Sequence, residues 1–266
     1  MAPAGFEVIS EIEPATKPDL TAVRHQVGVL APVSDAFLIP DNHLGRATVS
    51  SLAVAHEVAS MGVRSIACCN SRDRNRLGFR RDLLTAAAYG VDEFLCVFGD
   101  DPASGRRSHD LNVRAMLEEI RTFGASAAFD GHGPFRVGVT SRLAPMPAWK
   151  REAEFCLVQA SFDLGALLRW RDGLDFEGKV FAGVLVVAGP GMAKTLAEAT
   201  TEIDLPTDLL DQLESDRDAG VRRACDLMTD LEASGAFDGV HLVSVGRYRT
   251  VAARLEAQGW RRNRRV

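Results

Sequence analysis

Apolar and polar positions alternate along the chain with two different periods. Short runs of apolar and β-branched residues, typical of buried strands, are each followed by a longer segment with helical spacing. We predict eight strands, at Phe6–Ile12, Ala36–Ile39, Ser65–Cys69, Glu93–Phe98, Phe135–Thr140, Phe155–Ala160, Val180–Val187 and Val240–Val245. We predict helices at Leu20–Leu30, Ser50–Met61, Phe79–Tyr89, Leu111–Phe123, Leu164–Arg171, Met192–Thr200, Arg217–Ser234 and Thr250–Gln258.

Strands that alternate with helices pair in parallel through right-handed crossovers. Eight such units within 266 residues match the size of a TIM (β/α)8 barrel, an α/β fold. A doubly wound open sheet is the alternative, but such a sheet more often stops at about five to seven strands. No linker, low-complexity tract or charge block divides the chain, so we predict one domain over residues 1–266 with a short Arg-rich tail at 260–266.

Composition narrows the class of protein. The chain has 31 Lys and Arg against 36 Asp and Glu, a net charge of −5, which argues against a nucleic-acid partner. No stretch approaches the roughly 18 apolar residues of a membrane span, and no signal peptide is evident at the start. The five cysteines lie mostly in strand-like runs and lack the spacing of metal ligands, so we expect buried thiols, no metal and a cytoplasmic location.

In a TIM barrel, chemistry takes place at the carboxyl ends of the strands. Glu11 ends the first strand among apolar neighbours, which favour the protonated form of a carboxyl and suit it to donate a proton. Asp100 follows Gly99, a residue that lets a flat ligand approach the backbone. Gln159 lies inside a strand-like run, where a buried amide needs a partner. An exposed carboxylate, a helix-capping Asp and an amide that faces the helices are the competing interpretations.

Two further segments carry candidate chemistry. The loop Arg72–Arg76 is dense in charge and could bind a phosphate or a carboxylate, or it could be solvated. The segment Ala188–Thr195 looks like a phosphate loop but lacks the required spacing, so we interpret it as a turn that opens a helix. No GxSxG, HExxH or GxGxxG pattern points to a hydrolase, a zinc protease or a Rossmann site.

Taken together, these residues resemble the 5,10-methylenetetrahydrofolate reductase family over most of the chain. The residues that carry the resemblance are Glu11-Ile12-Glu13-Pro14, Asp41-Asn42, the loop Ser71–Arg76, Asp82-Leu83-Leu84, Ala88, Gly90, Gly99-Asp100, and Gln159 with Phe162-Asp163. The resemblance implies a TIM barrel that reduces methylenetetrahydrofolate to methyltetrahydrofolate, a step of one-carbon metabolism and methionine biosynthesis. It also implies FAD as cofactor and NADH or NADPH as electron donor.

The resemblance assigns roles to individual residues. Glu11 would be the general acid that helps the folate's five-membered ring to open to an iminium, which then accepts hydride. Asp100 and Gln159 would contact the pterin. The residues that would line the cofactor or substrate mouth are Asp41, Asn42, Asn70, Arg72, Asn75 and Gly99. Because a folate is anionic, positive charge should be placed locally, and Arg72, Arg74 and Arg142 are the candidates.

The sequence also departs from the family pattern. Glu13 replaces an aromatic residue, Phe98 stands where flavin-binding members often have Arg, and Thr140-Ser141-Arg142 replaces a Pro-Glu-x-His segment. Several of these positions serve FAD binding in the family, so a flavin-free member that takes hydride from a nicotinamide or a deazaflavin remains open. The sequence is also compatible with a barrel that binds a folate or pterin without turnover, with a partner subunit in methyl transfer, and with a methyltransferase. It allows a monomer as well as a homo-oligomer.

Overall fold

Eight parallel strands form the centre of the molecule and pair in sequence order, and the pairing of β1 with β8 closes them into a barrel. The computed structural model describes residues 5–199 and 203–262. The strands are β1 (Glu7–Glu11), β2 (Ala36–Ile39), β3 (Arg64–Asn70), β4 (Glu93–Val97), β5 (Arg136–Ser141), β6 (Phe155–Val158), β7 (Lys179–Leu185) and β8 (Gly239–Val243). The predicted TIM barrel is therefore confirmed, and so is each of the eight predicted strands.

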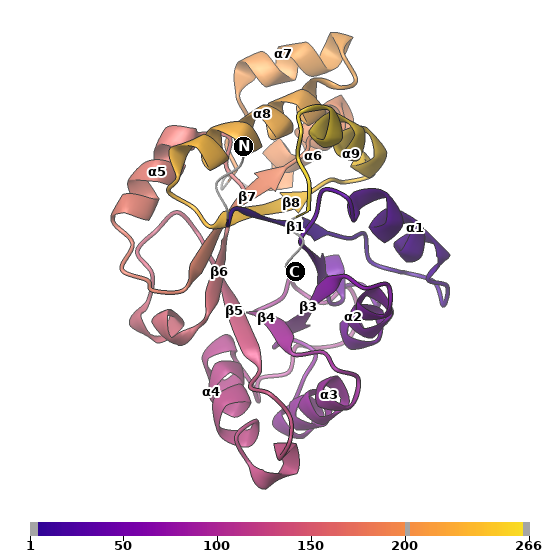
Figure 1. Ribbon diagram of the computed structural model, residues 1–266, viewed down its shortest axis with the longest axis vertical. Coiled ribbons are helices and arrows are strands. Elements are labelled where there is room, and N and C mark those ends of the chain that lie inside the picture. The colour runs from indigo at the N-terminus through magenta and orange to yellow at the C-terminus, as the bar shows by residue number, and fades with distance from the viewer. Residues whose placement is uncertain (1–4, 200–202, 263–266) are drawn as a thin grey trace.

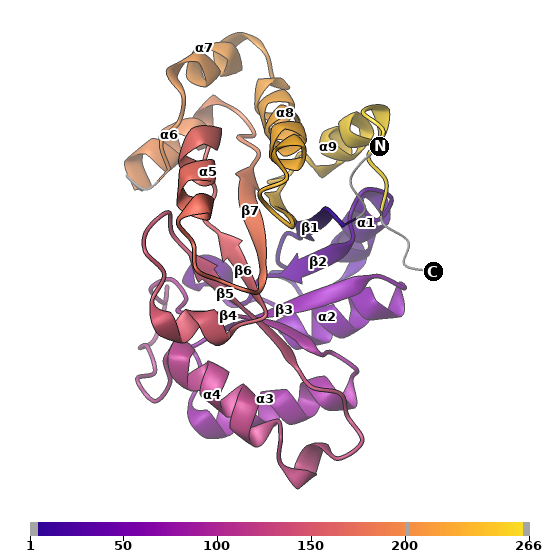
Figure 2. The same cartoon turned by 60° about the vertical axis from the view of Figure 1, so that its left-hand side comes forward.

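Helices surround the barrel (Figures 1 and 2). They are α1 (Thr21–Leu30), α2 (Ser51–Ser60), α3 (Arg76–Ala88), α4 (Val113–Phe123), α5 (Leu164–Asp172), α6 (Pro190–Ala199), α7 (Thr207–Ser215), α8 (Ala219–Ser234) and α9 (Tyr248–Ala257). Eight of these match predicted helices, of which one was predicted to end at Thr200, outside the described residues. The short α7 was not predicted; its Leu209 and Leu213 are buried one turn apart against the outer helices.

The barrel interior is filled by an apolar layer at mid-height. Ile9, Ile66, Phe155 and Phe181 pack there in one cluster. Gly138 makes room for it, since a Cβ at this position would lie 2.1 Å from the Phe155 ring. This layer closes the barrel from below and limits how deep a ligand can enter from the carboxyl ends of the strands.

A ring of alternating charge closes the opposite, amino-terminal end. Glu7 pairs with Arg64 at 2.7 Å and with Lys179, and Glu93 pairs with Arg64 at 3.2 Å and with Arg136 at 3.0 Å. Burial alone would raise the pKa of Glu7, but the bonds from Lys179 and Arg64 hold it below its ordinary value. The pKa of Glu93 is raised, chiefly by burial. These charged groups pair with one another at the amino-terminal end. We therefore expect ligand binding at the carboxyl ends of the strands.

The described part of the predicted tail, residues 260–262, lies at the same amino-terminal end. Trp260 packs beside Phe6 with ring centroids 6.0 Å apart, and Arg262 donates its backbone N–H to Pro32 at 2.7 Å. Residues 263–266 lie outside the described part of the chain. In that described part, none of the helices has the length and apolar character needed to cross a membrane.

Candidate functional site

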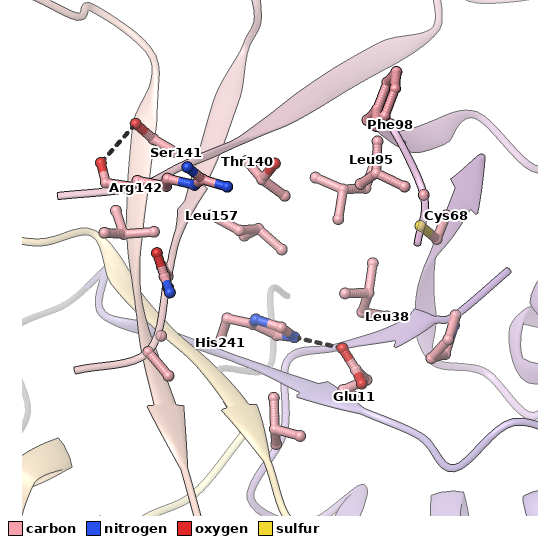
Figure 3. A pocket seen from close by; sticks show the side chains of 18 of the residues that line it. Glu11, Leu38, Cys68, Leu95, Phe98, Thr140, Ser141, Arg142, Leu157 and His241 are labelled. Carbon is pink, nitrogen blue, oxygen red and sulfur yellow. Dashed lines mark hydrogen bonds and ion pairs between the residues drawn. The ribbon is translucent and has the colours of Figure 1, made fainter. Parts of the chain in front are cut away.

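A cavity of about 710 Å³ opens at the carboxyl ends of the strands and is lined by residues from all eight of them or the loops that follow. Leu38, Cys68, Leu95 and Leu157 form an apolar floor around its centre (Figure 3). The volume lies in the range of small-molecule sites, in which apolar walls carry a few polar groups. The face predicted to hold the chemistry is thus hollowed by a cavity of suitable size.

Two ionisable side chains meet at this floor. Glu11 is the last residue of β1, and His241 lies on the neighbouring strand β8. The imidazole Nε2 is 3.1 Å from Oε2 of Glu11, and the two side chains are 20% exposed for Glu11 and 14% exposed for His241. Figure 3 shows them turned toward each other at the edge of the cavity.

The His241 partner was not predicted. A usable signal is present in the sequence, because His241 alternates with the buried Val240 and Leu242 and so belongs to the opposite, barrel-facing side of its strand. A carboxyl and an imidazole in hydrogen-bond contact can hold one proton between them. Such a pair beside a ligand can supply or take up a proton during a reaction.

The end of β4 forms a second polar part of the wall. Gly99 has φ +80°, and a Cβ there would lie 3.0 Å from the Asn70 side chain, so the turn requires glycine. Asp100 follows it, lines the cavity and accepts a hydrogen bond from the backbone N–H of Leu44 at 3.1 Å. Arg107 stacks on the Phe98 ring at 3.9 Å and donates to the Gly99 carbonyl at 2.8 Å, which holds this turn in place.

Asp41, at the edge of the cavity, is the centre of a buried polar cluster. It accepts hydrogen bonds from the Asn70 backbone N–H at 3.0 Å and from the Asn70 amide at 2.5 Å. It also pairs with Arg74, whose Nε bonds Asp82 at 2.8 Å. Burial alone would lower the pKa of Arg74, but the negative charges around it, including these two carboxylates, raise it. Arg74, a candidate cation for folate, is therefore engaged inside the loop.

Arg72 ties together the loops that follow three neighbouring strands. Its side chain is 1% exposed. It bonds Asp73 through Nε at 2.7 Å and Nη2 at 2.6 Å, and it donates to the Asn42 carbonyl at 3.0 Å and the Asp100 carbonyl at 2.8 Å. The bonds from Arg72 lower the pKa of Asp73 to about 2.

The side chains of Asn42 and Asn75 also form hydrogen bonds within the protein. Asn42 adopts the left-handed conformation with φ 47°, donates to Asp73 at 2.8 Å and accepts from the Thr48 N–H at 3.0 Å. Asn75 caps α3 by accepting from the Gly78 N–H at 2.7 Å. Asn42 still lines the cavity, whereas Asn75 does not belong to its described lining.

The wall formed by β5, β6 and the loop between them carries the positive charge. Arg142 follows β5, and Figure 3 shows its guanidinium directed into the cavity. Lys150, in the short turn Ala148–Glu152, donates to the Thr140 carbonyl at 2.7 Å. Burial and the charge of Arg142 lower the pKa of Lys150. Gln159 also lines the cavity, and its backbone N–H donates to Ser141 at 2.8 Å.

The predicted site residues divide into two groups. Those that line the cavity are Glu11, Asp41, Asn42, Gly99, Asp100 and Gln159. Those outside its described lining are Asn70, Arg72 and Asn75. Their roles toward a ligand stay predictions. Within residues 5–199 and 203–262, no group of three His, Cys, Asp or Glu side chains could hold a metal ion.

Comparison with known proteins shows the fold alone. No protein-family model matches the chain, and no curated protein matches it in sequence. An uncharacterized protein from Clostridium thermocellum, which binds two copies of 5-methyl-5,6,7,8-tetrahydrofolic acid, is 10% identical with a TM-score of 0.66, over 96% of each chain. Tryptophan synthase from Mycobacterium tuberculosis is 15% identical with a TM-score of 0.53, over 98% of this chain and 94% of that one. The spore cortex-lytic enzyme SleL of Bacillus cereus is 11% identical with a TM-score of 0.56, over 98% of this chain and 76% of that one.

Proposed function

We propose that the cavity binds a tetrahydrofolate-type ligand and that the protein reduces 5,10-methylenetetrahydrofolate to 5-methyltetrahydrofolate. The observation that carries the proposal is the contact of Glu11 with His241 at the edge of an apolar floor. The family-like residues around the cavity support it. The likeness in fold to a barrel that binds 5-methyltetrahydrofolic acid supports the ligand class.

In the proposed reaction, the Glu11 carboxyl gives its proton to N10 of the folate. The bond between the methylene carbon and N10 breaks, and the electron pair of N5 forms the iminium. A hydride from the donor then adds to the methylene carbon, which becomes the methyl group, and the donor is oxidised by two electrons. His241 passes a proton taken from solvent to Glu11 through the 3.1 Å contact. The net change is the addition of one hydride and one proton.

Other parts of the cavity have supporting roles in this proposal. Asp100 and Gln159 lie on the wall and can bond the polar edge of a pterin. Leu38, Leu95 and Leu157 keep water from the floor, where water would hydrolyse an iminium.

The residues predicted to hold FAD do not fit that role as a set. The Arg72 guanidinium donates its hydrogen bonds to Asp73 and to two backbone carbonyls, and the Asn75 side chain caps a helix. A diphosphate needs donors that are available to it. The proposed reaction therefore has no flavin step, and we propose that hydride comes directly from a nicotinamide or a reduced deazaflavin that binds and leaves.

A folate-binding barrel without turnover is the second candidate. It is favoured by the same likeness in fold to an uncharacterized protein that binds a methyl-folate. A partner subunit in methyl transfer would have the same ligand. The two candidates differ in whether Glu11 is needed for a chemical step.

The test compares Glu11→Gln with Glu13→Gln in single-turnover reduction of methylenetetrahydrofolate by NADH, NADPH or a reduced deazaflavin. Glu13 is exposed and bonds the Gly246 backbone, outside the described cavity lining. We expect E11Q to lose a factor of about 10²–10⁴ in rate, with folate affinity retained, because the proton donor is gone. E13Q should react like the wild type. Normal turnover by E11Q would refute the general-acid role, and folate binding without any product would favour the second candidate.

A further inference from the structure

Phe98 is a large apolar side chain that is exposed at the ligand-binding end of the barrel. It follows β4 directly and is 59% exposed, whereas Phe94, Leu95 and Cys96 within that strand are buried. It lines the cavity, and Figure 3 shows its ring beside Leu95 at the edge of the cavity. A ring in this place leaves apolar surface in water until a ligand covers it.

One face of the Phe98 ring is covered by Arg107. The guanidinium carbon lies 3.9 Å from the ring centroid, and the Arg107 side chain is 14% exposed. Its nitrogens donate to the backbone carbonyls of Phe98 at 2.9 Å, Gly99 at 2.8 Å and Asp100 at 3.2 Å. Because these three bonds fix the guanidinium, the ring that rests on it is held in one orientation. The opposite face of the ring is the one left for a ligand.

The free face of the ring suits a flat aromatic ligand. Two aromatic rings attract each other when they stack with an offset. The cation against the far face draws electron density toward itself, so the free face favours a partner that is rich in electrons. The reduced form of a hydride-donating ring is such a partner, since it carries two more electrons than the oxidised form.

Phe98 lies across the cavity from the proton-transferring pair. Glu11 and His241 belong to the adjacent strands β1 and β8, and β4 stands opposite β8 in the closed order of eight strands. Figure 3 shows Phe98 on the other side of the cavity from both. In the proposed reaction the pterin is protonated from the Glu11 side. Hydride transfer needs a second flat ring against the pterin, and the Phe98 ring can hold that second ring from the β4 side.

We propose that Phe98 is the stacking surface for the hydride-donating ring, a dihydronicotinamide or a reduced deazaflavin, and that it positions this ring against the pterin. This inference rests on the proposed function and adds to it a residue that binds the electron donor. Loss of the aromatic ring should therefore weaken binding of the donor and leave binding of the folate unchanged.

The test is single-turnover reduction of methylenetetrahydrofolate by the full-length protein, with NADH, NADPH and a reduced deazaflavin each varied in concentration. Phe98→Leu keeps an apolar side chain and removes the ring. The half-saturating concentration of the donor that the wild type uses should rise about 3–10-fold in F98L, the effect of losing one aromatic pair. The affinity for 5-methyltetrahydrofolate, measured by calorimetric titration, should stay the same.

Tyr89→Leu is the matched control. Tyr89 is also an exposed aromatic residue, at 48%, but it stacks on His56 and is absent from the described cavity lining. Y89L should therefore use the donor like the wild type. Phe98→Trp keeps an aromatic face and should stay within about threefold of the wild type. An equal loss in F98W and F98L would show that the aromatic ring is not the cause and would overturn the proposal.

The remaining outcomes separate this inference from the proposed function. If F98L and the wild type reduce the folate with the same half-saturating donor concentration, the stacking role is wrong and the proposed function stands. If F98L loses affinity for 5-methyltetrahydrofolate instead, the ring packs on the folate and the assignment to the donor is overturned. If the wild type reduces methylenetetrahydrofolate with none of the donors, the proposed function fails and this inference fails with it.

Discussion

Replacing Arg72 with Met should destabilise the fold and leave folate contacts chemically intact. The guanidinium satisfies the Asn42 and Asp100 carbonyls at 3.0 and 2.8 Å and the carboxylate of Asp73. Met keeps much of the apolar stem and removes every donor. Each carbonyl loses a hydrogen bond from a charged donor, worth about 1–3 kcal/mol, although the Asn42 carbonyl keeps the Gly45 N–H at 3.1 Å and the Asp100 carbonyl keeps Arg107 at 3.2 Å. Asp73 can turn to solvent, so we expect a total loss of about 2–6 kcal/mol. For a chain of this size that corresponds to a fall in Tm on the order of 5–15 °C.

Urea unfolding of R72M against the wild type measures this loss, with Arg76→Met as the control. Arg76 is 55% exposed and makes one ion pair, with Glu119 at 3.2 Å, so its replacement should cost less than about 1 kcal/mol. The prediction from the family resemblance, that Arg72 binds a ligand, leads to the opposite result. Unchanged stability of R72M together with a large loss of ligand affinity would refute the structural role of Arg72.

Three further changes test other parts of the structure. Glu7→Ala removes the buried carboxylate that Arg64 and Lys179 share; because Arg64 keeps Glu93 at 3.2 Å and both cations are part-exposed, the change should cost about 1–3 kcal/mol in urea unfolding at neutral pH. The pKa of Glu7 is lower in the folded protein than its ordinary value. Its contribution to stability is therefore complete above its ordinary pKa and is lost as the pH falls through the folded value. The difference in unfolding free energy between E7A and the wild type should narrow in acid, and a difference independent of pH would contradict this. Gly138→Ala places a methyl against the Phe155 ring and should lower stability by about 1–3 kcal/mol in thermal unfolding, whereas an unchanged Tm would show that the interior can yield. His241→Asn removes the imidazole from Glu11 and should slow single-turnover reduction by about 10–100-fold with folate affinity retained, and an equal rate would exclude a role for this contact.

The fold could be predicted because its determinants are local. Each strand is a short apolar run of its own, as in Phe155–Val158, and the number of such runs selected the closed barrel. Glu11 and Asp100 could be placed at the mouth because each stands at or just beyond the end of such a run. Gln159 was expected inside its run and could have faced either way; β6 ends at Val158, and Gln159 lines the cavity. The α7 helix escaped prediction because two buried leucines one turn apart are a weak signal.

The pairing of polar groups could not be predicted, because it depends on contacts between distant parts of the chain. His241 reaches Glu11 only because β8 closes the barrel against β1, 230 residues away. Arg72 could equally have faced a ligand, and only the packing of three loops turns it inward. Charged side chains in a loop need hydrogen-bonding partners. Whether those partners are ligands or backbone carbonyls of the same chain depends on how the chain folds.

Reduction of the folate is tested most directly by following the fate of the hydride. The wild-type protein, without added flavin, is mixed with methylenetetrahydrofolate and in turn with NADH or NADPH carrying deuterium at the transferable position, or with a deazaflavin reduced with deuterium, and the folate products are analysed by mass spectrometry. We predict 5-methyltetrahydrofolate with one deuterium in its methyl group from one of these donors, and loss of this product in E11Q. Bound methylenetetrahydrofolate that is returned unreduced with every donor would contradict the proposed reaction.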